Sequence, residues 1–466
     1  MTVQTDRARS TAATAAIRET DVEAFKSRFR GPLLGPNDDG YERARRVWNG
    51  MIDRRPALIA RCAGAADVRA AVNFARERQL PVSVRGGGHS VAGKAVCDAG
   101  VMIDLSLMKS IRVDSSARTA RVEPGVLWGE FDRETQAFGL ATPGGLVSTT
   151  GIAGLALGGG QSLLTGMYGL TLDNLISADV VIADGTLLRA SATENADLFW
   201  ALRGAGANFG VVTSFEFRLH PVDAVLGGMV IHPLDRAGDV LRFYREFTAT
   251  EPDALTSYAA LLTTAEGHPV VAIVTCYVGD PNDGERVVAP IRRFGTPIAD
   301  LIGPTTYVAM QSLLGPAYPA GRLNYWKSSM TNEIPDELID TLGDHVKRVP
   351  SPFTSTVLAE CHGAYSRVGK SDTAYWPRDE RYDLVIISSW ANPSETDQNI
   401  AWTRSFFDAI DPYLSRSVYV NDLGDDEGRD RIRAAYGGNY DRLLTLKRKY
   451  DPTNFFRINQ NIDPSV

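Results

Sequence analysis

Apolar positions recur with two different spacings in the first half of the chain. Residues 57 to 84 predict a strand, a helix and a second strand, from an apolar run (ALIARC), helical spacing (AADVRAAVNFARERQ) and another apolar run (LPVSV). Strand-like segments (VMIDLS and ARTARVEPG) precede a predicted helix (VLWGEFDRETQAFGL) that ends at Gly139. A predicted hairpin (LISADVVIADGTLLRAS) turns at Asp184 and Gly185, before a helix (NADLFWALRG) and an alternating strand (FGVVTSFEFRL). This order indicates an α/β domain without a regular βαβ repeat.

The pattern changes after His220 and Pro221. Longer strand-like runs follow (AVLGGMVI, SYAALLTT, PVVAIVTCYV, STVLAECHG and YDLVIISSW), separated by helical stretches such as AGDVLRFYREFTAT. Such a pattern is typical of an antiparallel sheet with helices on one side. We therefore divide the chain into an N-terminal arm and lead-in (1–50), an α/β domain (51–221), a second domain (222–410) and a C-terminal segment (411–466) with a helical middle.

Composition excludes several classes of partner. The net charge is −7 and no run of Lys or Arg occurs, which argues against binding to nucleic acid. The four cysteines are widely separated, so we expect neither a disulfide framework nor a metal site. The N-terminus has no apolar core of a signal peptide and no apolar run reaches membrane-spanning length. We expect a cytoplasmic protein with no membrane partner.

Two segments are unusually rich in glycine. One is VSVRGGGHS, residues 82–90, and the other spans residues 144–170. Dense glycine costs backbone entropy, and it allows close approach and exposes successive N–H groups that can surround a pyrophosphate. Each segment alone could be a set of tight turns, whereas together they favour a bound dinucleotide. GAGANFG (204–210) follows a helix and precedes a strand, the reverse of a Rossmann loop, and GGG at 158–160 lacks the Lys-Ser/Thr of a phosphate loop.

Four segments resemble the berberine-bridge-enzyme-like flavoprotein oxidases of the vanillyl-alcohol-oxidase superfamily. They are VSVRGGGHS, GLVSTTGIAGLALGGGQSLLTGMYGLTLDNL, LFWALRGAGANFGVVTSFEFRLHPV and NYDRLLTLKRKYDPTNFFRINQNI, in family order. The resemblance implies an α+β protein with an FAD-binding domain made from residues 51–221 and the returning segment 411–466. A substrate-binding domain, an antiparallel sheet covered by helices, is inserted between them.

The resemblance gives His89 a specific role. In the family, the histidine of RGGGH is bonded covalently to the 8α-methyl group of the flavin. A neutral imidazole is a nucleophile at neutral pH, so the residue type suits this chemistry. Many members form a second bond from the cysteine of G-x-C-P-x-V-G. Residues 145–151 fill that pattern with Val147 in place of the cysteine, so we predict FAD attached through His89 only.

The resemblance also implies the other cofactor-binding positions. In the first loop and the long glycine segment these are Arg85, Gly86, Gly87, Gly88, Ser90, Gly144, Gly145, Val147, Ser148, Thr150, Gly151, Gly154, Leu155, Gly158, Gly159, Tyr168, Gly169, Asp173 and Asn174. Later in the chain they are Gly210, Val211, Val212, Tyr419, Asn421 and Asn459.

Three of these positions relate the chain to a subgroup. Thr150 stands where the family controls the access of oxygen to the flavin. Together with Val147 and Leu155, it resembles the bacterial, singly linked members, in which oxygen-reactive flavins, including a flavin-N5-oxide form, occur. Ordinary core packing explains Val147 and Leu155 equally well.

The resemblance offers two candidates for the catalytic base. Tyr419 lies in a Y-x-N motif, but a phenol with an ordinary pKa of about 10 is a poor base unless a neighbour lowers that pKa. Glu360 lies on a predicted strand of the substrate domain. His362, Tyr365 and Tyr258 are candidates to line the substrate pocket. The family's histidine is missing from the stretch TAYWPR (373–378), which leaves the local correspondence open.

The expected activity is that of an FAD-dependent oxidase. It would take a proton and a hydride from a small organic substrate, with O2 reoxidising the flavin to give H2O2. Aromatic residues at 365–390 slightly favour a flat phenolic or polyketide-like secondary metabolite over a sugar. The alternatives are an oxygenating enzyme of the flavin-N5-oxide type, a sugar or alcohol oxidase of the same fold, and a flavin-binding protein without turnover.

Overall fold

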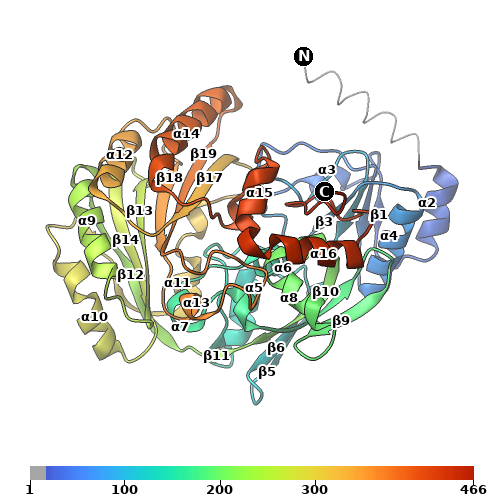
Figure 1. Cartoon of the computed structure of the whole chain (residues 1–466), viewed down its shortest axis with the longest axis horizontal. Coiled ribbons are helices and arrows are strands. Elements are labelled where there is room, and N and C mark those ends of the chain that lie inside the picture. The colour runs from blue at the N-terminus through green and yellow to red at the C-terminus, as the bar shows by residue number, and fades with distance from the viewer. Residues whose placement is uncertain (1–16) are drawn as a thin grey trace.

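The computed structural model describes residues 17–466, whose elements form two groups lying side by side (Figure 1). One group is a large sheet with helices on its outer face, and the other contains the smaller sheets and their helices. Residues 1–16 of the predicted arm lie outside the described residues. The rest of the lead-in forms helix α2 (Glu19–Lys26), strand β1 (Leu33–Leu34) and helix α3 (Tyr41–Arg45).

A four-stranded sheet carries the first glycine loop. Its order is β1, β2 (Leu58–Arg61), β4 (Val101–Asp104) and β3 (Val82–Arg85). Strands β2, β4 and β3 are parallel, and β2 and β4 are apolar and buried, as parallel strands usually are. Helix α4 (Ala65–Glu77) packs Val68, Ala71 and Val72 into their core, as its spacing predicts. Strand β3 leads directly into the glycines.

A five-stranded antiparallel sheet follows. Its order is β5 (Ile111–Asp114), β6 (Thr119–Val122), β10 (Val211–Arg218), β8 (Leu175–Val181) and β9 (Leu187–Ser191). The predicted hairpin is β8–β9, and Gly185 in its turn has a φ of 86°, which glycine adopts readily. Four helices belong to this part: α5 (Trp128–Gln136), α6 (Ile152–Gly158), α7 (Thr165–Tyr168) and α8 (Ala196–Ala205). The short strands β7 (Leu140–Ala141) and β11 (His220–Pro221) pair beside them.

The large sheet has eight strands and is antiparallel throughout. Its order is β15 (Ala299–Asp300), β12 (Ala224–Pro233), β14 (Pro269–Tyr277), β13 (Leu255–Thr263), β18 (Ser355–Glu360), β19 (Tyr382–Trp390) and β17 (Leu323–Thr331), with β16 (Gly303–Thr306) also paired to β12. The helices of this part are α9 (Ala237–Thr248), α10 (Pro281–Arg293), α11 (Tyr307–Ser312), α12 (Asp336–Val346), α13 (Ala364–Arg367) and α14 (Thr396–Ile410). Helices α9, α12 and α14 share one apolar core with its outer face.

Alternation along the strands gives this sheet a second, inner face, which α11 covers in part through Tyr307 and Met310. On β18 and β19, Leu358, Leu384 and Ile386 join the helix-covered core, so the neighbouring positions Val357 and Val385 face the other way. Strand β17 is absent from the predicted strands. It is an edge strand, and its polar sequence LNYWKSSMT masks the alternation.

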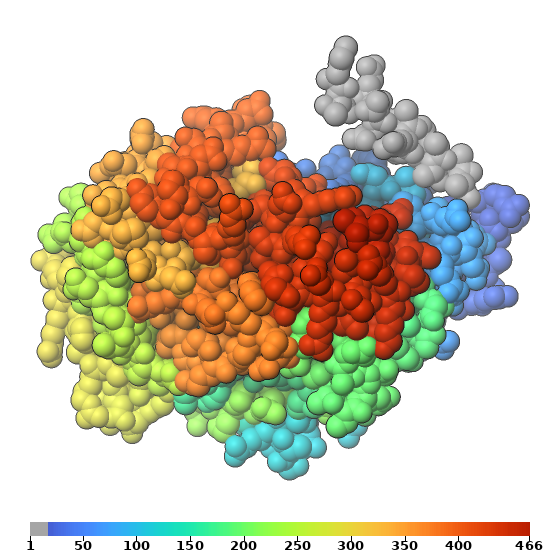
Figure 2. Space-filling view, viewed as in Figure 1, coloured from blue at the N-terminus to red at the C-terminus, as the bar shows by residue number. Residues whose placement is uncertain are grey.

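The C-terminal segment returns to the smaller sheets. Helices α15 (Arg429–Tyr436) and α16 (Tyr440–Tyr450) share the apolar core of the five-stranded sheet, and in the space-filling view this red segment forms part of the visible face (Figure 2). The buried Lys447 ammonium donates to Asp451 at 2.8 Å and to the carbonyl oxygens of Asn208 and Phe456 at 2.8 and 2.9 Å. In the part of the chain that the structure describes, no helix is both long and apolar enough to cross a membrane.

Candidate active site

A cavity of about 1140 Å³ lies between the glycine loops and the inner face of the eight-stranded sheet. Its walls come on one side from residues within the segments 86–90, 145–158, 204–210, 419–422 and 456–460, not all of which line it. On the other side are inward-facing residues of β12, β13, β14, β18 and β19. Pockets for one drug-sized ligand reach about 1,000 Å³ at most, so the volume suits a cofactor together with a substrate.

The two glycine loops touch each other at one wall of this cavity. A Cβ atom at Gly87 would lie 2.5 Å from the Cα of Gly151, closer than real Cβ atoms come. Gly151 forms a β-bridge to Leu127, and the N–H of Trp128 donates to the Thr150 carbonyl at 2.9 Å. The sequence predicts two separate loops for one ligand, and the structure brings their backbones into contact.

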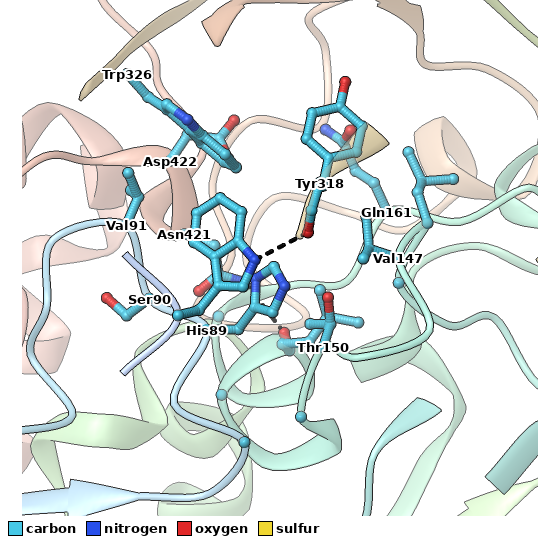
Figure 3. Close-up of a pocket in the computed structure, with 18 of the residues that line it drawn as sticks. His89, Ser90, Val91, Val147, Thr150, Gln161, Tyr318, Trp326, Asn421 and Asp422 are labelled. Atoms are coloured by element: carbon cyan, nitrogen blue, oxygen red, sulfur yellow. Dashed lines mark hydrogen bonds between the residues drawn. The ribbon is translucent and has the colours of Figure 1, made fainter. Parts of the chain in front are cut away.

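His89 stands at the end of the first loop, where it lines the cavity (Figure 3). Its ring stacks on Trp48 with the centroids 4.4 Å apart, and Nε2 lies 3.4 Å from Thr149 Oγ1. The Trp48 indole N–H donates to the Tyr318 carbonyl at 3.1 Å, which fixes the plane of the stack. Burial lowers the pKa of His89 to about 4, so the imidazole is neutral at pH 7. Trp48 belongs to no motif, and the sequence does not reveal this contact.

Tyr419 and Asn421 bind the second glycine loop. The Tyr419 hydroxyl oxygen accepts from the Gly160 N–H and from Asn421 Nδ2, each at 2.7 Å. Asn421 also donates to the Leu155 carbonyl at 3.2 Å. Burial raises the pKa of Tyr419, which makes the phenol a weaker acid than usual. In this geometry Tyr419 keeps its proton and can donate it into the cavity.

A buried carboxyl pair lies beside the cavity and is missing from the predicted site. Gln161, which lines the cavity, donates to Asp383 Oδ2 at 2.7 Å, and Asp422 lines the cavity nearby (Figure 3). Burial raises the pKa of Asp383 to about 7. Burial, and then the charge of Asp383, raises the pKa of Asp422 well above its usual value. The pair therefore holds at least one proton at neutral pH.

Most of the predicted cofactor-binding residues line the cavity. They are Gly86, Gly87, Gly88, His89, Ser90, Gly145, Val147, Thr150, Gly151, Gly154, Leu155, Gly158, Gly210, Val212, Tyr419, Asn421 and Asn459, and Tyr258 lines it from the sheet. Arg85, Gly144, Ser148, Gly159 and Val211 are chain neighbours of these residues but do not line it themselves.

Four predicted cofactor-binding residues form a separate structural cluster. Asp173 pairs with the buried Arg378 at 2.6 Å, and it accepts from the Leu170 N–H at 2.9 Å. Asn174 lies 2.7 Å from His220, and Tyr168 stacks on that histidine at 3.9 Å. Together with Gly169, these residues hold the end of the glycine segment against β11 and do not line the cavity.

Glu360, His362 and Tyr365 also lie outside the cavity lining. Val357 and Ala359 of β18 line the cavity, so alternation directs Glu360 to the helix-covered side of the sheet. There Glu360 pairs with His362. Burial lowers the pKa of His362, but the bond to Glu360 outweighs this effect and raises it to about 9. Tyr365 is fully buried, with its hydroxyl 3.2 Å from that of Tyr375.

The walls fit the FAD that the resemblance implies. Glycine backbone dominates the loops at Gly86–Gly88 and Gly151–Gly158, so a large planar or phosphate-bearing group can approach the main chain closely. Asn459 uses its amide N–H groups on the carbonyls of Ala207 and Phe456, while its buried Oδ1 has no partner among the described residues. That atom is available to a donor on a bound cofactor.

Comparison with known proteins agrees with this geometry. The FAD binding domain family model matches residues 56–191, and the berberine and berberine-like model matches residues 418–463. An FAD-linked oxidoreductase of Dictyostelium discoideum is 32% identical over 446 residues, covering 95% of this chain and 97% of its own. The (R)-6-hydroxynicotine oxidase of Paenarthrobacter nicotinovorans is 31% identical over 452 residues, covering 94% and 97%.

Comparison with solved structures also finds a hydroxynicotine oxidase. The crystal structure of 6-hydroxy-D-nicotine oxidase from Arthrobacter nicotinovorans superposes with a TM-score of 0.86 at 28% identity, covering 94% of this chain and 98% of that one. The α+β architecture expected from the sequence, a flavin-binding part and an antiparallel sheet with helices, is confirmed.

The contact between the loops gives a direct test of the cavity. We expect Gly87→Ala to lose most of its bound FAD, because the methyl group forces Gly151 and the second loop away. Gly343→Ala is the matched control, since a Cβ at that helical position meets no atom within 4 Å and alanine favours helix. The measurement is the ratio of flavin absorbance to protein absorbance after purification. Equal flavin content in the two variants would contradict a role of the contact between Gly87 and Gly151 in FAD binding.

Proposed function

The chain belongs to the berberine-bridge-enzyme-like FAD-linked oxidoreductases, and on that basis we propose that it is an FAD-dependent oxidase of small organic molecules. The observation that carries the proposal is the neutral His89 at the point where the glycine loops meet the cavity. When bound there, FAD would supply a two-electron acceptor that O2 can reoxidise with formation of H2O2.

We further propose that His89 is the only covalent anchor, as in the bacterial singly linked members. Its low pKa keeps a ring nitrogen free to act as a nucleophile, and the Trp48 stack holds the ring in one orientation. Val147 lines the same cavity from the second loop, and its side chain has no atom that could form a thioether. Both residues therefore support attachment of the flavin through a single bond.

The carboxyl pair is our candidate for the proton acceptor. Asp383 and Asp422 are next to the cavity, whereas Glu360 lies on the far side of its strand. A shared proton leaves one carboxylate able to accept a second one. The other ionisable groups facing Asp383 are Tyr258, Cys361, Tyr375 and Tyr419, and burial raises the pKa of each of them, so they stay neutral. Tyr419 would hold substrate by donating its hydroxyl proton.

The oxidase reaction can be tested before a substrate is known. The purified protein is reduced anaerobically with one equivalent of dithionite and then mixed with oxygenated buffer. We expect about one H2O2 per flavin, and reoxidation slower by roughly tenfold in Thr150→Leu because the larger side chain narrows the cavity beside the cofactor. The exposed Thr186→Leu is the control. Reoxidation without peroxide would contradict an oxidase.

The pH dependence of stability tests the carboxyl pair. Between pH 4 and 7 folded Asp383 keeps a proton that the unfolded chain has lost, so the free energy of unfolding must fall as pH rises through this window. The fall attributable to Asp383 is up to about 4 kcal/mol. We expect Asp383→Asn to flatten it in urea titrations. Asp408→Asn, the same substitution at an exposed position on α14, is the control, and an unchanged slope in Asp383→Asn would refute the shared proton.

A further inference from the structure

The sheet side of the cavity is apolar over most of its width. The apolar and aromatic residues of the sheet that line it from the inner face are Met229, Tyr258, Ala260, Leu262, Val274, Val357, Ala359, Val385 and Ile387. Two polar residues at strand ends also line the cavity, Thr263 on β13 and Ser355 on β18, and the Ser355 hydroxyl lies 3.0 Å from that of Tyr318. The Tyr258 hydroxyl donates a hydrogen bond to the Ser162 carbonyl at 2.8 Å. The central part of this wall therefore offers a substrate no free hydrogen-bond donor.

An apolar wall discriminates between substrate classes. A sugar placed against it would lose the hydrogen bonds that its hydroxyl groups make to water, and each unpaired buried hydroxyl costs binding free energy. A flat ring system gains from the same contact because it removes apolar area from water. The aromatic side chains of Trp48, Tyr318, Trp326 and Phe353 also line the cavity and add stacking faces.

One cation on the cavity wall has no carboxylate partner. Arg322 directly precedes β17 and is half-buried, with its guanidinium 3.8 Å above the ring of Phe353. Its one side-chain hydrogen bond among the described residues goes from Nη1 to the Ala317 carbonyl at 3.1 Å. Lys94, the other lining lysine or arginine, pairs with Asp425 at 2.5 Å. Most of the Arg322 donors remain available.

The surroundings of Arg322 place it at the rim beside His89. Phe353 is 39% exposed, as is the nearby lining residue Leu313, so this part of the cavity reaches the surface. The Gly321 N–H donates to the Trp48 carbonyl at 2.9 Å, and Trp48 stacks on His89. The main chain next to Arg322 is thus tied to the residue that stacks on His89, and Asp422 also lines the cavity.

We propose that the substrate is a flat, largely apolar ring system carrying one anionic oxygen, which Arg322 binds at the rim. The inference rests on the proposed function and adds the substrate class to it. Arg322 attracts the anion and the inner carboxyl pair repels it, so the two charges set the direction in which the molecule enters. The uncharged, oxidisable end then points inward, toward the flavin and the carboxyl pair.

Binding to the flavin-loaded protein tests this without turnover. The probes are 2-naphthoate, its neutral analogue 2-naphthamide, and cellobiose, each titrated while the visible flavin spectrum is recorded. We expect naphthoate to bind at least about tenfold more tightly than naphthamide, and cellobiose to cause no change. Arg322→Met should abolish the preference for the acid, and Arg322→Lys should retain part of it. Arg112→Met, at an exposed position on β5, should behave as the unchanged protein.

Three results would overturn the proposal. They are equal binding of acid and amide, binding of cellobiose alone, and no binding of either naphthalene probe at millimolar concentration. If Arg322→Met does not fold, the comparison of acid with amide in the unchanged protein and in Arg322→Lys still decides. A protein that holds FAD and forms peroxide but shows no preference refutes only this substrate class. A protein that holds no FAD refutes the proposed function itself.

Discussion

The contact between Gly87 and Gly151 is the constraint on which the site depends. Two loops that are far apart in the sequence meet main chain to main chain, and any side chain at Gly87 would part them. That contact closes one wall of the cavity, places His89 at its edge and leads directly into helix α6. These glycines lose more backbone conformational entropy on folding than other residues would, and in return the wall consists of main chain alone.

Burial acts in opposite directions on the two chemical groups of the site. It lowers the pKa of His89 and so keeps the imidazole neutral, while it raises the pKa of Asp383 and keeps a carboxyl protonated near pH 7. Both effects follow from removing charged forms from water. The consequence is a site with an uncharged nucleophile at one point and a protonated carboxyl group at another. The carboxyls lower stability at neutral pH, which is typical of functional groups rather than structural ones.

The sequence predicts the features that depend on local patterns. The hairpin β8–β9, helix α4, the antiparallel sheet and the run RGGGHS each have their signal within a few residues of the element itself. The position of Glu360 depends instead on which face of β18 each residue occupies, and one residue of register moves it from the cavity to the helices. Trp48 and Asp383 carry no motif, because their roles come from tertiary contacts. Strand β17 escapes prediction because its edge position tolerates polar residues.

The most direct test of the account is the location of the flavin on the chain. The purified protein is precipitated with acid, digested, and its peptides are analysed by mass spectrometry. We expect the colour to stay with the protein and one peptide containing His89 to carry the flavin. No peptide containing Val147 should carry it, and His89→Ala should release the cofactor into the supernatant. Flavin that washes out of the unchanged protein, or that is found on another residue, would contradict this expectation.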